Sequence, residues 1–217
     1  MSRAEATKGR ILAAATAEFS AYGIAGARVD RIAASAEANK NLIYVYFSSK
    51  DKLFDAVFDA NVVRVMDEVP FTAEDLPGYA GRLFDFYLAH PELLRLATWH
   101  RLERGGDSAN GIAAVEDSYR HKLDSIASVQ RDGAVDPSLS PSVLLTLVLA
   151  ISAAWGSASP SVVPSYPGRD SGEGACRAAI VDAVARLMAP AGSAAGQAGQ
   201  RPGVEPPRFS SPDLPVR

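Results

Sequence analysis

Residues 28–53 restrict the possible folds of this chain more than any other segment. Four apolar residues in this segment follow the spacing i, i+3, i+4 and i+7, which predicts a short helix with one buried face. They are Val29, Ile32, Ala33 and Ala36. A tight turn follows, and Asn39 is placed to cap a second helix in which Ile43 and Phe47 face inward. The segment therefore predicts two short helices joined by a turn.

The second of these helices leaves polar and aromatic side chains outside its buried face. Lys40, Asn41 and Tyr44 lie on the other faces, with Tyr46 as a further candidate. One of the two tyrosines is expected to pack inside while the other stays outside. Side chains of this kind suit the major groove of DNA, where cations and amides meet base edges and phosphates. The pattern therefore indicates a DNA-reading surface.

Two Ser/Thr-x-x-Asp patterns predict the starts of later helices. Ser48 with Asp51 opens a helix that carries Lys50 in its first turn. Free N–H groups and the positive end of the helix dipole favour a phosphate at that place. Thr72 with Asp75 opens another helix farther along the chain.

At these residues the chain resembles the TetR family of bacterial transcriptional regulators. The resemblance rests on a first helix from Thr7 to Tyr22 that ends at Gly23, and on three short motifs: Ile32-Ala33, Tyr44-x-Tyr46-Phe47 and Ser49-Lys50-Asp51-Lys52-Leu53. It covers roughly the first quarter of the chain and implies a helix-turn-helix DNA-binding domain, with Tyr44 as the outward tyrosine. The residues expected at DNA are Arg28, Asn39, Lys40, Asn41, Tyr44, Tyr46 and Lys50.

The chain departs from the family pattern at two places. Glu37 stands at the turn position that is usually glycine, where the backbone can require a positive φ that is costly for glutamate. Ala27-Arg28 stands where the family usually has two threonines. Arg28 could then replace a hydroxyl contact to phosphate with a charged one.

Composition sets only broad limits. The chain has 217 residues, of which 47% are hydrophobic, enough for one or two packed domains. No apolar run reaches the roughly 18 residues of a membrane span, and the N-terminus lacks a signal-peptide core, so the sequence predicts a cytoplasmic protein with no membrane partner. Cys176 is the single cysteine and has no partner for an internal disulfide, in agreement with a reducing compartment.

The net charge of −3 does not by itself indicate a nucleic-acid partner. The first sixty residues hold eight Lys or Arg and seven Asp or Glu side chains. Attraction to DNA would therefore come from a local basic patch rather than from an overall basic surface. The motif, and not the charge, predicts DNA binding.

The periodic segments beyond residue 53 also have helical spacing, which predicts an all-α fold. Pro91 suits the first position of one helix, and Pro141 suits the first position of another after the cap Ser140. Asp132-Gly133 closes a further helix.

We expect a helix-turn-helix DNA-binding domain over residues 1–53 and a larger helical domain for effector binding and dimerisation over 54–189. Residues 190–217 are dominated by small residues and proline and predict a disordered tail. The helices at about 141–157 and 173–189 are rich in apolar residues. The resemblance implies that they form a homodimer as a four-helix bundle, and a monomeric core is the alternative.

Aromatic residues in the middle of the chain are candidates for a ligand pocket, because such pockets lie between helices and have mostly apolar walls. They are Phe84, Tyr87, Trp99, Tyr119 and Trp155. Aromatic residues at helical spacing are equally typical of an ordinary core, and the spacing alone leaves both readings open.

Motifs for catalysis are absent from the sequence. It contains no Gly-x-Ser-x-Gly, Walker-type loop, dinucleotide-binding glycine pattern or His-Glu-x-x-His. The three histidines, His90, His100 and His121, have no cysteine nearby. The sequence therefore predicts a protein that is not an enzyme, with no metal site and no cofactor.

These patterns together predict a ligand-responsive transcriptional regulator, and the resemblance favours a repressor. It would bind a near-palindromic operator in double-stranded DNA as a homodimer and be released by a small-molecule effector. The alternative is a helical interaction protein whose helix-turn-helix no longer reads DNA. Glu37 and the small basic excess favour that alternative.

Overall fold

The computed structural model of the chain describes residues 3–104, 113–157 and 173–189. In these ranges every regular element is a helix, which confirms the expected all-α fold. The elements in chain order are α1 (Arg3–Gly26), α2 (Val29–Ser35), α3 (Lys40–Phe47), α4 (Lys50–Glu68), η1 (Ala73–Asp75, a 3-10 turn), α5 (Leu76–Ala89), α6 (Pro91–Arg104), α7 (Ala113–Arg131), α8 (Pro141–Ser157) and α9 (Glu173–Met188). No helix in the described ranges combines the length and hydropathy of a membrane span. The tail expected at 190–217 lies outside the described residues.

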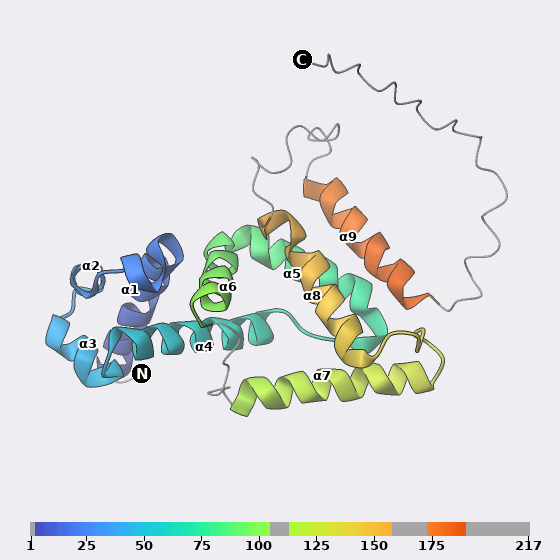
Figure 1. The fold of residues 1–217 in the computed structure, drawn as a ribbon, viewed down its shortest axis with the longest axis horizontal. Helices are drawn as coiled ribbons and strands as arrows, with labels where there is room; N and C mark the ends of the chain where they lie inside the picture. The colour runs from blue at the N-terminus through green and yellow to red at the C-terminus, as the bar shows by residue number, and fades with distance from the viewer. Residues whose placement is uncertain (1–2, 105–112, 158–172, 190–217) are drawn as a thin grey trace, which may run out of the picture.

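The helices form a small group and a large group that are joined by α4 (Figure 1). α1, α2 and α3 lie together at one end of the molecule, and α5, α8 and α9 lie together at the other. α4 extends from the small group toward the large one. α1 packs against both α4 and α6, while α5 packs against both α8 and α9. The small group is therefore held to the rest of the molecule by two helices.

The small group has a hydrophobic cluster of its own. Phe19 of α1 and Phe54 of α4 are fully buried in it, and their rings meet edge to face with centroids 5.2 Å apart. Leu96 of α6 is buried in the same cluster. Each side chain of this size contributes about 1.5–3 kcal/mol when it is removed from water. The cluster extends beyond residue 53 into α4 and α6. The expected domain boundary at residue 53 therefore does not coincide with the edge of this cluster, and the boundary remains a prediction.

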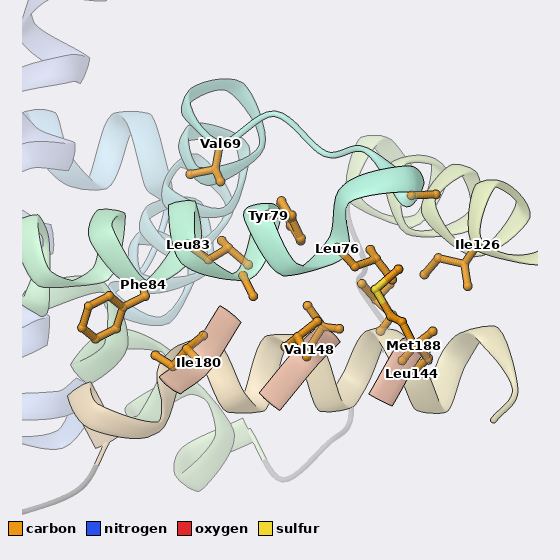
Figure 2. Packing of buried hydrophobic residues seen from close by; sticks show 14 of the residues in the cluster. Val69, Leu76, Tyr79, Leu83, Phe84, Ile126, Leu144, Val148, Ile180 and Met188 are labelled. Carbon is orange, nitrogen blue, oxygen red and sulfur yellow. The ribbon is translucent and has the colours of Figure 1, made fainter. Parts of the chain in front are cut away.

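The large group has a second cluster, in which α5 faces α8 and α9 (Figure 2). Its members come from distant parts of the chain. They include Val69, Leu76, Tyr79, Leu83, Phe84, Ile126, Leu144, Val148, Ile180 and Met188. The fold of this half therefore depends on contacts between segments that are far apart in sequence.

The first helix is interrupted at Gly23, as the sequence predicts. Gly23 has φ 66° and ψ −176°, and a short helical turn follows it to Gly26. A Cβ atom at Gly23 would lie 2.7 Å from Glu103 Oε1 and 2.9 Å from Trp99 Cε3. The carboxylate of Glu103 accepts a hydrogen bond from the N–H of Ile24 at 2.9 Å. The end of α6 is thus fitted to the interruption in α1, and only glycine suits that place.

Both capping boxes expected from the sequence are wrong. Ser48 has φ 64° and closes α3, since its N–H donates to the carbonyl of Tyr44. A residue in that conformation cannot also be the extended cap of the next helix. Ser49 takes the role instead, with its hydroxyl accepting from the N–H of Lys52 at 3.1 Å.

The second pattern fails because a 3-10 turn precedes the helix. Thr72 makes no side-chain capping bond, and Asp75 caps α5 by accepting from the N–H of Gly78 at 2.9 Å. The turn at η1 moves the start of the helix three residues along the chain.

Three other helix boundaries agree with expectation. α6 begins at Pro91 and α8 begins at Pro141. The hydroxyl of Ser140 accepts from the N–H of Val143 at 3.4 Å, and Gly133 after α7 has φ 78°. The signals at these places are local, and the structure confirms them.

Candidate DNA interface

α3 is a short helix with one buried face and both ends satisfied. The side-chain oxygen of Asn39 accepts from the N–H of Asn41 at 2.8 Å, which confirms the expected cap. Ile43 is 1% exposed and Phe47 is 6% exposed. Because these two residues fix α3 on the small cluster, the remaining faces of the helix point away from the core.

The outward faces carry the side chains expected there, and one more. Lys40 and Asn41 are exposed, and Tyr44 is 41% exposed. Val45 was not among the expected residues, although it is 75% exposed. It lies two residues from Ile43 and from Phe47, about 200° around the helix from each. Helical geometry alone would have placed Val45 on the outside.

The two tyrosines of α3 have different surroundings. Tyr46 packs against the small cluster, and its ring meets that of Phe47 at a centroid distance of 6.2 Å. Tyr44 is the more exposed of the two, as expected. A contact between Tyr44 and DNA remains a prediction.

Lys40 is held by a carboxylate of the neighbouring helix. Its Nζ lies 2.8 Å from Oδ1 of Asp30 and 3.1 Å from Oδ2. The hydrogen bond and the charge of Asp30 raise the pKa of Lys40. Asp30 lies in the first turn of α2, ten positions earlier in the chain, and sequence spacing gave no sign of the pair. To contact DNA, Lys40 must either break its ion pair with Asp30 or bind Asp30 and DNA at the same time.

Lys50 and Arg28 lie near the junction between α1 and α2. Lys50 Nζ donates to the carbonyl of Ala27 at 3.3 Å, and Lys50 is the first residue of α4. Arg28 occupies the cap position of α2 without a side-chain capping bond, and its side chain is exposed. The two cations border the same junction, and this arrangement suits contacts to phosphate.

A buried carboxylate holds this junction together. Oε1 of Glu18 accepts from the backbone N–H of Arg28 at 2.8 Å and from Nε of Arg31 at 2.8 Å. Burial alone would raise the pKa of Glu18, but the hydrogen bonds from Arg31 and Arg28 outweigh burial and lower it. Glu18 is 9% exposed. Sequence reasoning missed this pair, because its members lie on different helices.

The turn between α2 and α3 has the strained residue that the sequence predicts. Glu37 has φ 50°. The N–H of Ala38 donates to the carbonyl of Ala33 at 3.0 Å, and Arg10 Nε donates to the carbonyl of Ala36 at 3.1 Å. α1 therefore supports a turn in which glutamate adopts a left-handed backbone.

The aromatic residues expected to bind a ligand do not share one cluster. Phe84 is 3% exposed in the large cluster and Tyr87 packs against it, and burial raises the pKa of Tyr87. Trp99 packs against the small cluster, while Tyr119 is 39% exposed. The side chain of Trp155 lies outside the described residues. A ligand-binding role for these five residues remains a prediction.

An exposed helix, capped and joined to a second helix by a tight turn, defines a helix-turn-helix protein. Two family models match the chain, one over the helix-turn-helix and one over the larger group of helices. Residues 11–57 match the model for bacterial regulatory proteins of the tetR family. Residues 75–186 match the model for the tetracyclin repressor-like C-terminal domain. The second match spans more than half of the chain, and the chain belongs to the TetR family of bacterial transcriptional regulators.

Individual relatives agree with this assignment. The HTH-type transcriptional repressor SCO4008 of Streptomyces coelicolor is 44% identical over 131 residues, which are 60% of this chain and 68% of that protein. The HTH-type transcriptional repressor NicS of Pseudomonas putida is 30% identical over 110 residues, which are 48% of this chain and 52% of that protein.

A solved structure extends the similarity over most of the fold. It is the crystal structure of SCO4942 from Streptomyces coelicolor, described as a transcriptional regulator. Its TM-score is 0.72 with 37% sequence identity, over 84% of this chain and 98% of that one. The similarity thus includes both groups of helices and is not confined to the helix-turn-helix.

Proposed function

We propose that this DNA-binding regulator is a repressor that binds a near-palindromic operator as a homodimer and releases it when a small-molecule effector binds. The observation that carries the proposal is α3, which is fixed by Ile43 and Phe47 while Lys40, Asn41 and Tyr44 lie outside. Two curated relatives bear the name of repressor.

The residues at the interface take different roles in this proposal. Lys40, Asn41 and Tyr44 on α3 meet base edges in the major groove. Arg28 and Lys50 meet phosphates on either side of the groove and set the register of the protein. Asn39 and Tyr46 contribute from the edges of α3: Asn39 orders its first turn, and Tyr46 is partly buried beside Phe47.

Dimerisation is proposed to use α8 and α9. Val143 of α8 is 45% exposed, and Leu149 and Ile151 of the same helix are only partly buried against the large cluster. A second copy that covers these residues would remove this apolar surface from water. The two copies of α3 would then enter successive major grooves, roughly 34–36 Å apart.

Salt dependence is the test of DNA binding. Genomic fragments that the full chain retains are selected, and the affinity for one of them is measured over a range of salt concentrations. Lys50→Ala should weaken binding about equally on selected and random duplexes and reduce the log–log salt slope by about 1, because one phosphate contact is lost. Asn41→Ala should instead cost roughly 1–3 kcal/mol on the selected duplex alone.

Arg131→Ala is the matched control, since Arg131 is exposed at the end of α7, far along the chain from α3. It should bind like the parent. Binding that does not depend on salt, or equal binding by all variants, would contradict DNA reading and favour an interaction protein instead. Sedimentation of a folded monomer would contradict the dimer.

A further inference from the structure

A groove lies at the junction of the two groups of helices, and none of the five aromatic residues expected to bind a ligand lines it. It has a volume of about 600 Å³ and is lined by α1, α4 and the first turns of α6. Small-molecule sites fall in the range of roughly 300–1,000 Å³ and are frequent where domains meet. The groove is therefore of a size and in a place that suit a small ligand.

The hollow exists because, apart from Leu12, the α1 wall has only short side chains. Ala13, Thr16, Ala17, Ser20 and Ala21 line it, and none of them is long enough to fill the space in front of α4. The hydroxyl groups of this wall are bonded within the helix, Thr16 to the carbonyl of Leu12 at 2.9 Å and Ser20 to the carbonyl of Ala17 at 3.0 Å. The α1 side thus offers an apolar surface to a ligand.

The opposite wall is charged. Arg64 of α4 and Arg95 of α6 both line the groove. Arg64 is fixed in place, because its Nε donates to Glu68 at 2.7 Å and its guanidinium lies 5.7 Å from the ring centroid of Phe86. Arg95 is exposed and forms no ion pair with any residue in the described part of the chain.

Two further groups set the polarity of the groove. Asn61 donates through Nδ2 to the carbonyl of Val57 at 2.7 Å and to Thr16 Oγ1 at 3.2 Å. Glu92 is the one acidic side chain in the lining, and it lies 3.5 Å from Nδ1 of His90. Because Arg64 is already ion-paired with Glu68, Arg95 supplies the positive charge of the lining that no acidic residue in the described part of the chain pairs with. A ligand with a single negative charge is therefore favoured.

We propose that this groove binds a small organic carboxylate. Its carboxylate pairs with Arg95, whose planar guanidinium group matches the two oxygens of a carboxylate, and its apolar part lies against the alanines of α1. The inference rests on the proposed function in one respect: a ligand that contacts α1, α4 and α6 together shifts the molecule toward the arrangement that it fits best. That shift should weaken operator binding by a factor of about 5–150.

The test uses the full chain and a panel of aliphatic and aromatic monocarboxylates, each with its neutral primary amide. Binding is detected by saturation-transfer NMR and measured by calorimetry. At least one carboxylate should bind at millimolar concentration or below, with its amide about tenfold weaker or more, because a charge-assisted bond is lost. Arg95→Ala should weaken that carboxylate by a similar factor.

Ala17→Leu fills the groove and should abolish binding, while thermal unfolding checks that this variant is folded. The controls are Arg131→Ala and Ala97→Leu, two exposed positions outside the lining, and both should bind the carboxylate like the parent. If no member of the panel binds, or if Arg95→Ala and Ala17→Leu both bind like the parent, the inference is overturned.

Operator binding without ligand separates this result from the proposed function. A parent chain that binds its operator but no carboxylate would overturn only the proposal that the groove binds a carboxylate. A chain that binds carboxylate but no operator would overturn the proposed function alone. Carboxylate binding that leaves operator affinity unchanged would overturn the coupling.

Discussion

The small and the large group of helices are specified in different ways. In the small group, directed polar bonds fix particular points: Asn39 caps α3, Ser49 caps α4 and Glu18 joins α1 to α2. In the large group, α5 is covered by α8 and α9 through broad apolar contact. The difference shows why single caps and buried faces of the small group could be predicted from the sequence, while only the outline of the large group could be predicted.

The largest expected effects come from truncating each core. Phe54→Ala in the small group should cost about 3–5 kcal/mol and Leu144→Ala in the large group about 2–5 kcal/mol, since both residues are fully buried. Urea unfolding measures both. Because α4 and α6 join the groups, both variants should shift one common transition. Two separate transitions would mean that the groups are independent.

The next effect tests the fit between α6 and α1. Gly23→Ala should destabilise the chain by about 1–3 kcal/mol, because the backbone conformation of Gly23 is nearly restricted to glycine and the new methyl group meets Trp99 and Glu103. Gly9→Ala is the control in the same helix, where nothing lies within 4 Å. It should stabilise by about 0.5–1 kcal/mol. Equal changes in stability for Gly23→Ala and Gly9→Ala in thermal unfolding would contradict the requirement for glycine at position 23.

A smaller loss is expected at the junction of α1 and α2. Glu18→Gln should cost about 1–2 kcal/mol, a value reduced because Arg31 is partly in solvent. The pKa of Glu18 is lowered by folding, so its contribution is present at neutral pH and disappears as the pH falls through its folded pKa. Unfolding curves of parent and variant should converge in acid.

The control for Glu18 is a fully solvated pair. Asp117 and Arg120 lie 2.9 Å apart, and both are more than two-thirds exposed. Asp117→Asn should change stability by less than about 1 kcal/mol. A loss as large as that of Glu18→Gln would show that burial does not distinguish the two pairs.

The smallest effect has the opposite sign. Glu37→Gly should stabilise the chain by up to about 1 kcal/mol, since glycine adopts the left-handed conformation of the turn without strain. Ala34→Gly inside α2 should destabilise it by about 1 kcal/mol. Denaturant unfolding of both variants decides whether the turn is strained. A loss at Glu37→Gly would show that the glutamate side chain supports the turn.

The successes of sequence reasoning lie where the signal is local. The buried faces of α2 and α3, the cap at Asn39 and the positive φ of Glu37 follow from spacing and residue type within a few positions. Ser48 shows where local signals fail, because Ser48 and Ser49 both suit the cap of α4. Only the conformation of Ser48 at the end of α3 leaves Ser49 as the cap.

The parts that could not be predicted depend on distant partners. The Glu18–Arg31 and Lys40–Asp30 pairs need the angle between helices. Trp99 was grouped with Phe84 and Tyr87 from its position in the sequence, yet it faces Gly23 in the other group of helices. Helical spacing gives the face of a helix that is buried but not the helix that covers it.

The length of α3 limits how the specificity of this protein can be engineered. An eight-residue helix is too short to persist alone in water, where roughly 12–15 residues are needed even for good helix formers. An excised α3 peptide would therefore lose its shape, and a transplanted α3 would need the matching surface beneath Ile43 and Phe47. If α3 reads the operator as proposed, new operator preferences have to be installed in place, through the exposed side chains of α3, with its caps and buried residues left unchanged.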